Sequence, residues 1–196
     1  MIRLPLVLAS RSPRRSELLR MFLDEAAPGR DFDVVPAAVD ESTRPDERPR
    51  DLVHRLALTK ARTVASRVVA GAVVIGSDTT VELDGESLGT PTDPDDAKRM
   101  LRRLSGRTHL VHTGVAVVRG DSEASGVDTA RVTLMTLTED VVDWYVATGE
   151  PMDKAGAYGV QGRGAALVER VDGAVTTVVG LPLRLLAEYL AASGWT

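Results

Sequence analysis

The chain has 196 residues, 43% of them hydrophobic and 27% charged, which excludes a disordered tail or a fibrous repeat and leaves enough material for a substantial core. Its 24 basic and 28 acidic residues give a formal charge of −4, which argues against broad binding to nucleic acid or to an anionic membrane. No cysteine is present, so disulfides, thiolate metal sites and cysteine nucleophiles are excluded.

The first third of the chain alternates between strand-like and helix-like patterns. The apolar run Leu4–Ala9 is typical of a short buried strand. It leads into a predicted helix that Ser12 caps, with a proline in the first turn, and that runs to about Phe22. A second short apolar run occupies Phe32–Val35. Apolar residues at helical spacing then predict a long helix over residues 50–69.

The middle of the chain predicts short strands around an acidic residue. The continuous apolar run Ala72–Ile75 reads as a buried strand, and Asp78 comes just after it, beyond Gly76 and Ser77. Val81–Leu83 precedes an Asp-Gly pair, which is typical of a hairpin turn. A helix is predicted over Pro94–Leu104, because a proline opens it and a glycine follows its last apolar residue.

The next segments predict a hairpin, a helix and a special loop. Leu110–Val118 and Ala130–Leu137 are strand-like and are expected to pair, with 120–126 as the polar connection. A helix capped by Thr138 follows. Residues 151–164 then contain four glycines, which predicts a loop with unusual backbone angles.

A closing helix over residues 181–192 completes the pattern. Helices that alternate with strands predict an α/β fold with a mixed, twisted sheet flanked by helices, and we expect one domain over residues 1–196. The apolar run Leu4–Ala9 is too short for a secretion signal, and no run approaches the roughly 18 apolar residues of a membrane span. We therefore predict a cytoplasmic protein.

The start of the first predicted helix is a candidate anion site. The free N–H groups and the dipole of a helix N-terminus attract negative charge. Arg14 and Arg15 add positive charge there, which costs about 0.3–1 kcal/mol each on an exposed helix unless an anion compensates. An ordinary solvated basic helix face explains the same residues, so the pattern alone leaves both interpretations open.

Carboxylates and a few lysines supply further candidates. Asp40 and Glu41 lie in a polar loop, where a turn with a capping role is the more usual explanation. Asp78 follows a predicted strand, where ligand groups of α/β sheets collect, and carboxylates of this kind bind Mg²⁺ or Mn²⁺. The chain has only three lysines, of which Lys60 and Lys154 are placed to bind phosphate.

Several common motifs are absent. The chain has no P-loop, no glycine fingerprint of a dinucleotide-binding helix and no nucleophile elbow. His109 and His112 are three residues apart in a predicted strand, which places them on opposite faces and makes them poor partners for a metal. Packing between strands is the preferred explanation for both.

Six blocks, in order and spread over nearly the whole chain, closely resemble the Maf family of nucleotide pyrophosphatases. Their joint occurrence is far more specific than any one of them. The blocks are Leu8-Ala9-Ser10-Arg11-Ser12-Pro13-Arg14-Arg15-Ser16-Glu17-Leu18-Leu19, Asp40-Glu41, Leu58-Thr59-Lys60-Ala61, Ser77-Asp78-Thr79, Asp153-Lys154-Ala155-Gly156-Ala157-Tyr158-Gly159-Val160-Gln161-Gly162 and Val179-Gly180-Leu181-Pro182.

The resemblance implies a cytoplasmic, homodimeric enzyme of Maf/ITPase-like fold with an active cleft between two lobes. Such an enzyme hydrolyses nucleoside triphosphates to the monophosphate and pyrophosphate with a divalent cation, Mg²⁺, Mn²⁺ or Co²⁺. The block that ends at Gln161 resembles the branch that prefers dTTP and UTP, and modified pyrimidine nucleotides are further candidate substrates. Neither nucleic acid nor a membrane is expected as a partner.

The resemblance, together with the charge of a triphosphate, also assigns roles to residues. Asp78 is the expected general base, Glu41 and Asp78 the metal ligands, and Lys60 a catalytic cation, although base and ligand roles compete for the oxygens of Asp78. The phosphate-binding group is Ser10, Arg14, Arg15, Lys60 and Lys154, and the group that selects the base is Arg14, Thr79 and Gln161.

Two positions depart from the family pattern. Thr90 stands where Gly-Lys-Pro is usual, which predicts weaker substrate binding or a slower reaction unless an arginine such as Arg163 compensates. Thr177 stands where asparagine is common, with no clear consequence. Because relatives are linked with septum formation and a lysine is missing, the alternative function is a nucleotide-binding regulator with weak or no turnover.

Overall fold

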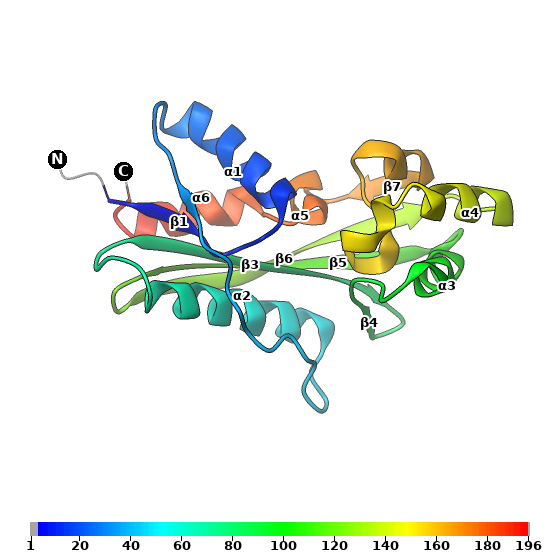
Figure 1. Ribbon diagram of the computed structural model, residues 1–196, viewed down its shortest axis with the longest axis horizontal. Helices are drawn as coiled ribbons and strands as arrows, with labels where there is room; N and C mark the ends of the chain where they lie inside the picture. The colour runs from blue at the N-terminus through cyan, green and yellow to red at the C-terminus, as the bar shows by residue number, and fades with distance from the viewer. Residues whose placement is uncertain (1–3, 196) are drawn as a thin grey trace.

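The computed structural model describes residues 4–195, so residues 1–3 and 196 of the expected domain lie outside the described residues. A seven-stranded sheet has the order β2-β1-β3-β5-β6-β7, with β4 paired to β3, and it contains both parallel and antiparallel pairs. This confirms the α/β class with a mixed sheet flanked by helices (Figure 1). The strands are β1 Leu6–Leu8, β2 Asp33–Val34, β3 Val73–Leu83, β4 Glu86–Leu88, β5 Thr108–Arg119, β6 Ser122–Leu134 and β7 Val168–Asp172.

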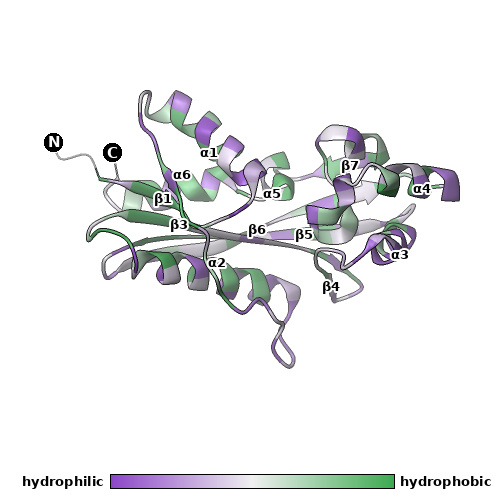
Figure 2. Cartoon of the chain, in the orientation of Figure 1, coloured by the Kyte–Doolittle hydropathy of each residue, from purple (hydrophilic) through white to green (hydrophobic). Residues whose placement is uncertain are grey.

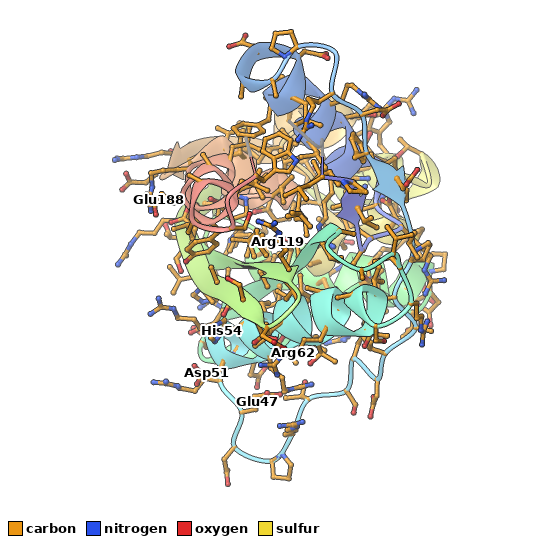
Figure 3. The ribbon with its side chains drawn as sticks, turned by 90° about the vertical axis from the view of Figure 1, so that its left-hand side faces the viewer. Glu47, Asp51, His54, Arg62, Arg119 and Glu188 are labelled. Atoms are coloured by element: carbon orange, nitrogen blue, oxygen red, sulfur yellow. The ribbon has the colours of Figure 1, made fainter. Side chains whose placement is uncertain are left out.

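Helices cover both faces of the sheet. They are α1 Pro13–Ala26, α2 Pro49–Ala65, α3 Pro94–Leu104, α4 Glu139–Ala147, α5 Val175–Val179 and α6 Leu183–Ala192. In Figure 1, α1, α5 and α6 lie on one side of the long strands and α2 on the other. The view along the sheet places His54 and Arg62 of α2 on one side and Glu188 of α6 on the other (Figure 3). Within residues 4–195, no helix is long and apolar enough to cross a membrane.

The expectation of two separate strands, Ala72–Ile75 and Val81–Leu83, is wrong, because β3 continues without interruption from Val73 to Leu83. Gly76 serves close packing here instead of a turn. A Cβ atom at Gly76 would lie 2.2 Å from the carbonyl oxygen of Ala57 in α2, and one at Gly114 would lie 2.2 Å from that of Val53. These glycines let the helix approach the strands. Because β3 continues to Leu83, Asp78 lies inside a strand and not beyond its end.

The predicted hairpin is confirmed, but its second strand is longer than expected. β5 and β6 pair from Thr108 with Thr133 to Arg119 with Ser122, so only Gly120 and Asp121 separate them. Most of residues 122–129 are polar and at least partly exposed, which hid their strand character from the hydrophobic pattern. The hairpin turn expected after Val81–Leu83 is confirmed, because β4 pairs with these residues of β3. The short elements β7 and α5 escaped sequence-based prediction, and so did three 3₁₀ helices at Glu150–Asp153, Ala155–Ala157 and Gly162–Leu167.

Two cores flank the first half of the sheet. One packs β1 and the start of β3 against α1 and α6, and the other packs the opposite face of these strands against α2. β1 is among the most hydrophobic parts of the ribbon, whereas the loop before α2 is hydrophilic (Figure 2). Arg119 ties the end of β5 to the C-terminus of α6, since its Nη1 donates to the carbonyl oxygen of Ser193 at 2.6 Å.

A separate core lies at the other end of the sheet. It joins the end of β3 and the start of β5 to α3, α4 and the glycine-rich segment, with Tyr145 and Leu134 among its fully buried side chains. β3 and β5 run through both halves of the molecule. The chain therefore has two lobes on a shared sheet, as expected, and the space between them is where functional groups from both can meet.

Candidate functional site

A cavity of about 380 Å³ lies between the two lobes, and most of the expected site residues line it. Both lobes contribute through α1, α2, β3 and the glycine-rich segment. The expected residues on its wall are Arg14, Arg15, Glu41, Lys60, Asp78, Thr79, Lys154 and Gln161. Ser10 lies in an adjoining cavity of about 140 Å³, which Arg15, Glu41 and Lys60 also line. The structure thus brings all nine residues together.

Lys60 is the centre of the charged part of this cavity. Its Nζ lies 2.6 Å from Oδ1 of Asp78 and 2.8 Å from Oε1 of Glu41. Leu56 and Leu52 line the cavity one and two turns before Lys60 on α2. This stripe of residues at i, i+4 and i+8 faces β3, so the helix presents an apolar surface that ends in a buried ammonium group.

Asp78 is a buried carboxyl group with cations on two sides. Burial raises the pKa of Asp78, because an apolar environment disfavours the charged form. Lys60 and then Arg15 oppose that shift with their positive charges. A carboxylate in such a place accepts a proton more readily than an exposed one, which suits a general base.

Glu41 and Asp78 are the candidate ligands for a divalent cation. Both carboxylates reach the same ammonium group, so their negative charges converge on one point of the cavity. Oxygen donors of this kind fit Mg²⁺ or Mn²⁺, which take their remaining ligands from water and substrate phosphates. No cluster of three or more histidine, aspartate or glutamate side chains suited to a metal occurs among residues 4–195, so protein ligands alone do not complete a shell.

Arg14 and Lys154 meet at Asp153. Nη1 of Arg14 donates to Oδ2 of Asp153 at 2.6 Å, and Nζ of Lys154 donates to Oδ1 of the same carboxylate at 2.7 Å. Two cations from different lobes therefore share one anion at the mouth of the cavity. Their charge exceeds that of Asp153 by one, and the exposed carboxylate can give way to a more highly charged ligand.

Arg15 has a different environment from its neighbour. It is partly buried, and its guanidinium donates to the carbonyl oxygens of Gly180 at 2.8 Å and Ser77 at 2.9 Å. It also donates to the hydroxyl oxygens of Thr79 and Ser10, at 3.0 and 3.3 Å. All three guanidinium nitrogens are engaged by the protein, in four hydrogen bonds. A guanidinium group has five N–H donors, so a phosphate can contact Arg15 through the remaining Nη2 hydrogen or by exchange of one of these bonds.

Glu150 holds the glycine-rich segment in place and escaped sequence-based prediction. Its carboxylate accepts hydrogen bonds from the N–H groups of Arg163 and Gly164 and from the hydroxyl of Tyr145, each at 3.0 Å. Its carbonyl oxygen accepts a bond from Lys154. The sequence shows only that Glu150 follows the glycine that ends a predicted helix and precedes the glycine-rich loop. This position is a weak signal of a structural role.

The apolar wall also escaped prediction. Leu52 and Leu56 were visible as part of a helical stripe, but nothing in the sequence distinguished their cavity position from core packing. Val81 and Tyr158 come from two different segments and were recognisable only once the chain was folded. These side chains give the charged cavity an apolar end.

The departures from the family pattern have clear structural settings. Thr90 is exposed and lines the cavity, so a lysine there would reach the site. Arg163, the expected compensating residue, does not line the cavity, and that expectation is wrong. Thr177 is buried, where its hydroxyl donates to Asp128 and its carbonyl oxygen accepts a bond from Thr113.

Both strand histidines have packing partners, as expected. Nε2 of His109 lies 2.7 Å from the hydroxyl of Tyr158, and burial lowers the pKa of His109 to about 4. His112 bridges Thr129 and Glu82, at 2.8 Å to each. Neither histidine lines the cavity.

Known proteins are similar to this chain over nearly its whole length. A family model described as Maf-like protein matches residues 5–193. A dTTP/UTP pyrophosphatase of Symbiobacterium thermophilum is 50% identical over 190 residues, which cover 97% of this chain and 94% of the relative. The dTTP/UTP pyrophosphatase of Moorella thermoacetica is 51% identical over 191 residues, covering 96% and 95%. A solved nucleoside-triphosphatase / dITP/XTP pyrophosphatase of Mycobacterium abscessus is similar at a TM-score of 0.47, with 15% identity over 96% of this chain and 97% of that one.

Proposed function

Because this chain belongs to the Maf-like protein family, we propose that it is a nucleoside triphosphate pyrophosphatase that hydrolyses dTTP and UTP to the monophosphate and pyrophosphate. The observation that carries the proposal is the cavity in which Lys60, Asp78 and Glu41 meet beside Arg14 and Lys154. A triphosphate carries about four negative charges; Lys60, Arg14 and Lys154 offset part of that charge, and a divalent cation would offset more. Ser10 adds a hydroxyl in the adjoining cavity.

The cations divide the work by position. Lys60 is buried and fixed between two carboxylates, so it holds the phosphates next to the reacting bond. Arg14 and Lys154 exchange Asp153 for the substrate, whose greater charge competes for the same donors. Arg15 holds Thr79 and the main chain of β3 in position through its hydrogen bonds. Thr79, Arg14 and Gln161 are the groups next to the base.

Asp78 takes a proton from the attacking water as the bond between the α and β phosphates breaks. Its burial favours the protonated form that this step produces. A divalent cation held by Glu41 and Asp78 would supply charge neutralisation and a more acidic water. Oδ1 of Asp78 already accepts a bond from Lys60, so Oδ2 is the oxygen that the base role and a bound cation would both need, and the two roles compete.

Four finer properties belong to the same proposal. Mg²⁺, Mn²⁺ and Co²⁺ are the candidate cations, and modified pyrimidine triphosphates are candidate substrates of the same cavity. Nucleoside triphosphates are found in the cytoplasm, which supports a cytoplasmic location for the protein. A homodimer is proposed on family resemblance alone, and analytical ultracentrifugation tests it.

Pyrophosphate release from a panel of nucleotides tests this function. The protein is incubated with dTTP, UTP, CTP, ATP or GTP and Mg²⁺, Mn²⁺ or Co²⁺, and pyrophosphate is measured. Selective release from dTTP and UTP, lost when EDTA replaces the metal, is the expected result. Nucleotide binding without release would favour the regulator instead, an alternative for which the uncharged Thr90 at the cavity is the specific observation.

A further inference from the structure

The loop that carries Glu41 has no helix or strand of its own between β2 and α2. Within residues 40–48 every residue is exposed except Glu47, which lies on the loop beside α2 (Figure 3). The side chain of Glu41 is 55% exposed, although it reaches Lys60 in the cavity. A candidate cation ligand on such a loop depends on whatever fixes the main chain of the loop.

Glu47 anchors the loop, because Arg55 of α2 holds its carboxylate with two parallel hydrogen bonds. Nε of Arg55 donates to Oε1 of Glu47 at 2.6 Å, and Nη2 donates to Oε2 at 2.7 Å. Both side chains are mostly buried, with 18% of Arg55 and 9% of Glu47 exposed. A fork of two charge-assisted bonds fixes the orientation of the two groups as well as the distance between them.

The same arginine holds the main chain next to Glu41. Nη2 of Arg55 also donates to the carbonyl oxygen of Ser42 at 3.0 Å. The N–H of Ser42 donates to Oδ1 of Asp40 at 2.9 Å, so a tight turn encloses Glu41. The loop therefore meets α2 at two points. Lys60 pairs with the side chain of Glu41, and Arg55, more than one turn earlier, binds the main chain that follows it.

The backbone is strained where the chain brings Glu47 to this arginine. Asp46, the residue before it, has a φ of 58°, in the left-handed region that residues other than glycine seldom adopt. The carboxylate of Glu47 also accepts a bond from the N–H of Arg44 at 3.1 Å, which closes the turn around Asp46. Backbone strain and a mostly buried ion pair both cost free energy, and strain of this kind clusters at functional sites.

The fork between Arg55 and Glu47 lies outside the cavity. Neither residue lines it, whereas Glu41 and Thr43 of the same loop do. A cation or a substrate in the cavity can therefore draw the carboxylate of Glu41 away from Lys60 while the fork keeps the main chain of the loop in place.

We propose that Arg55 and Glu47 are positioning residues that hold Glu41 where it binds the divalent cation. The inference rests on the proposed function, in which Glu41 is a cation ligand. The fork acts through the loop and touches neither the cation nor the substrate. Because the ligand is already in place, the cation does not have to order the loop when it binds, and a lower cation concentration is enough for the reaction.

The cation requirement of Glu47→Gln tests this inference, because the variant keeps the shape of the fork but removes its negative charge. Pyrophosphate release from UTP is measured against the free concentration of whichever of Mg²⁺, Mn²⁺ and Co²⁺ is most active. We expect the concentration for half the maximal rate to rise about tenfold, as for other groups that orient metal ligands, and kcat at saturating cation to change by less than about threefold.

The matched control is Glu123→Gln. Arg62, also on α2, holds Glu123 of β6 with the same kind of fork, its Nε donating to Oε1 at 2.7 Å, and neither residue lines the cavity. We expect this variant to keep the cation requirement within about twofold, because an exposed pair contributes little. A cation requirement of Glu47→Gln no higher than that of this control overturns the inference and leaves the proposed function standing.

Hydrogen exchange of the loop is a second readout that needs no catalysis. The N–H groups of Ser42 and Arg44 are hydrogen-bonded within the loop. We expect both to exchange at least about fivefold faster in Glu47→Gln, with exchange in β3 unchanged. A raised cation requirement with unchanged exchange contradicts an action through the loop. No cation-dependent release of pyrophosphate by the unaltered protein overturns the proposed function and this inference with it.

A second variant separates geometry from charge. Arg55→Lys keeps the positive charge, but a lysine cannot make two parallel bonds to one carboxylate. We expect the cation requirement to rise as it does in Glu47→Gln. A requirement equal to that of the unaltered protein would show that the charge alone is sufficient, which contradicts the proposal.

Discussion

Nζ of Lys60 lies 2.6 Å from Oδ1 of Asp78. This ion pair joins α2 to β3, which follows it in the chain. Both side chains are almost buried, with 9% and 12% of their surfaces exposed. A buried ion pair costs desolvation energy, so stability alone is a weak reason to keep one. The pair makes sense as a preformed site, where the ammonium is placed for phosphate and the carboxylate for a proton.

Replacing Asp78 tests the catalytic half of this pair. Asp78→Asn keeps the shape but removes the charge, and we expect kcat to fall by about 100-fold or more, as is usual for loss of a general base. The loss of stability should stay below about 3 kcal/mol, because Glu41 still neutralises Lys60. Steady-state kinetics and urea unfolding measure the two effects.

The matched control is Asp143→Asn. Asp143 pairs with Lys98 at the same 2.6 Å distance, but the pair is partly exposed and lies away from the cavity. We expect activity within about twofold of the unaltered protein, because exposed pairs contribute little. An Asp78→Asn protein as active as this control would rule out the base assignment.

The neighbours Arg14 and Arg15 should respond differently to replacement by lysine. Arg15→Lys leaves buried carbonyl oxygens of Ser77 and Gly180 short of donors, so we expect a loss of about 2–4 kcal/mol in stability. Arg14→Lys affects a partly exposed pair with Asp153, so stability should change by less than about 1 kcal/mol while KM rises. Urea unfolding measures the stability of both variants, and steady-state kinetics measure their KM. Equal stability of the two proteins would contradict the role of Arg15 as donor to these buried carbonyl oxygens.

The fold was predictable where periodicity was strong, and the site was predictable where residue chemistry was unusual. The stripe that forms α2 and the glycine after α3 are strong local signals. The path of β3 was not predictable, because Gly76 serves helix packing, which is a contact between segments far from it along the chain. Family resemblance identified Arg15 as a site residue, but its four acceptors meet only when α1, α5 and β3 come together.

Buried His109 should make stability depend on pH. Burial lowers its pKa to about 4, whereas an unfolded histidine titrates near 6.5. Between these values the unfolded chain binds a proton that the folded protein does not, so stability falls as pH falls, by about 1.4 kcal/mol per pH unit at most. Urea unfolding from pH 7 to pH 5 measures the slope. We expect the stability of His109→Gln to change less with pH over this range, and an unchanged slope would show that another group is responsible.

Thr90 offers a gain-of-function test. Thr90→Lys places a positive charge on an exposed residue that lines the cavity, so we expect KM for UTP to fall about fivefold, as an exposed charge pair allows. Ser122→Lys adds the same charge at the exposed β5–β6 turn and serves as control. Unchanged or lower catalytic efficiency in Thr90→Lys would show that a lysine at this position is not what limits the protein.

The identity of the broken bond tests the central claim most directly. Phosphorus-31 NMR of a reaction with UTP and Mg²⁺ distinguishes the products without a coupled enzyme. We predict one UMP and one pyrophosphate for each UTP consumed, and no UDP. UDP with inorganic phosphate, or no consumption of UTP at a protein concentration that binds it, would contradict the account.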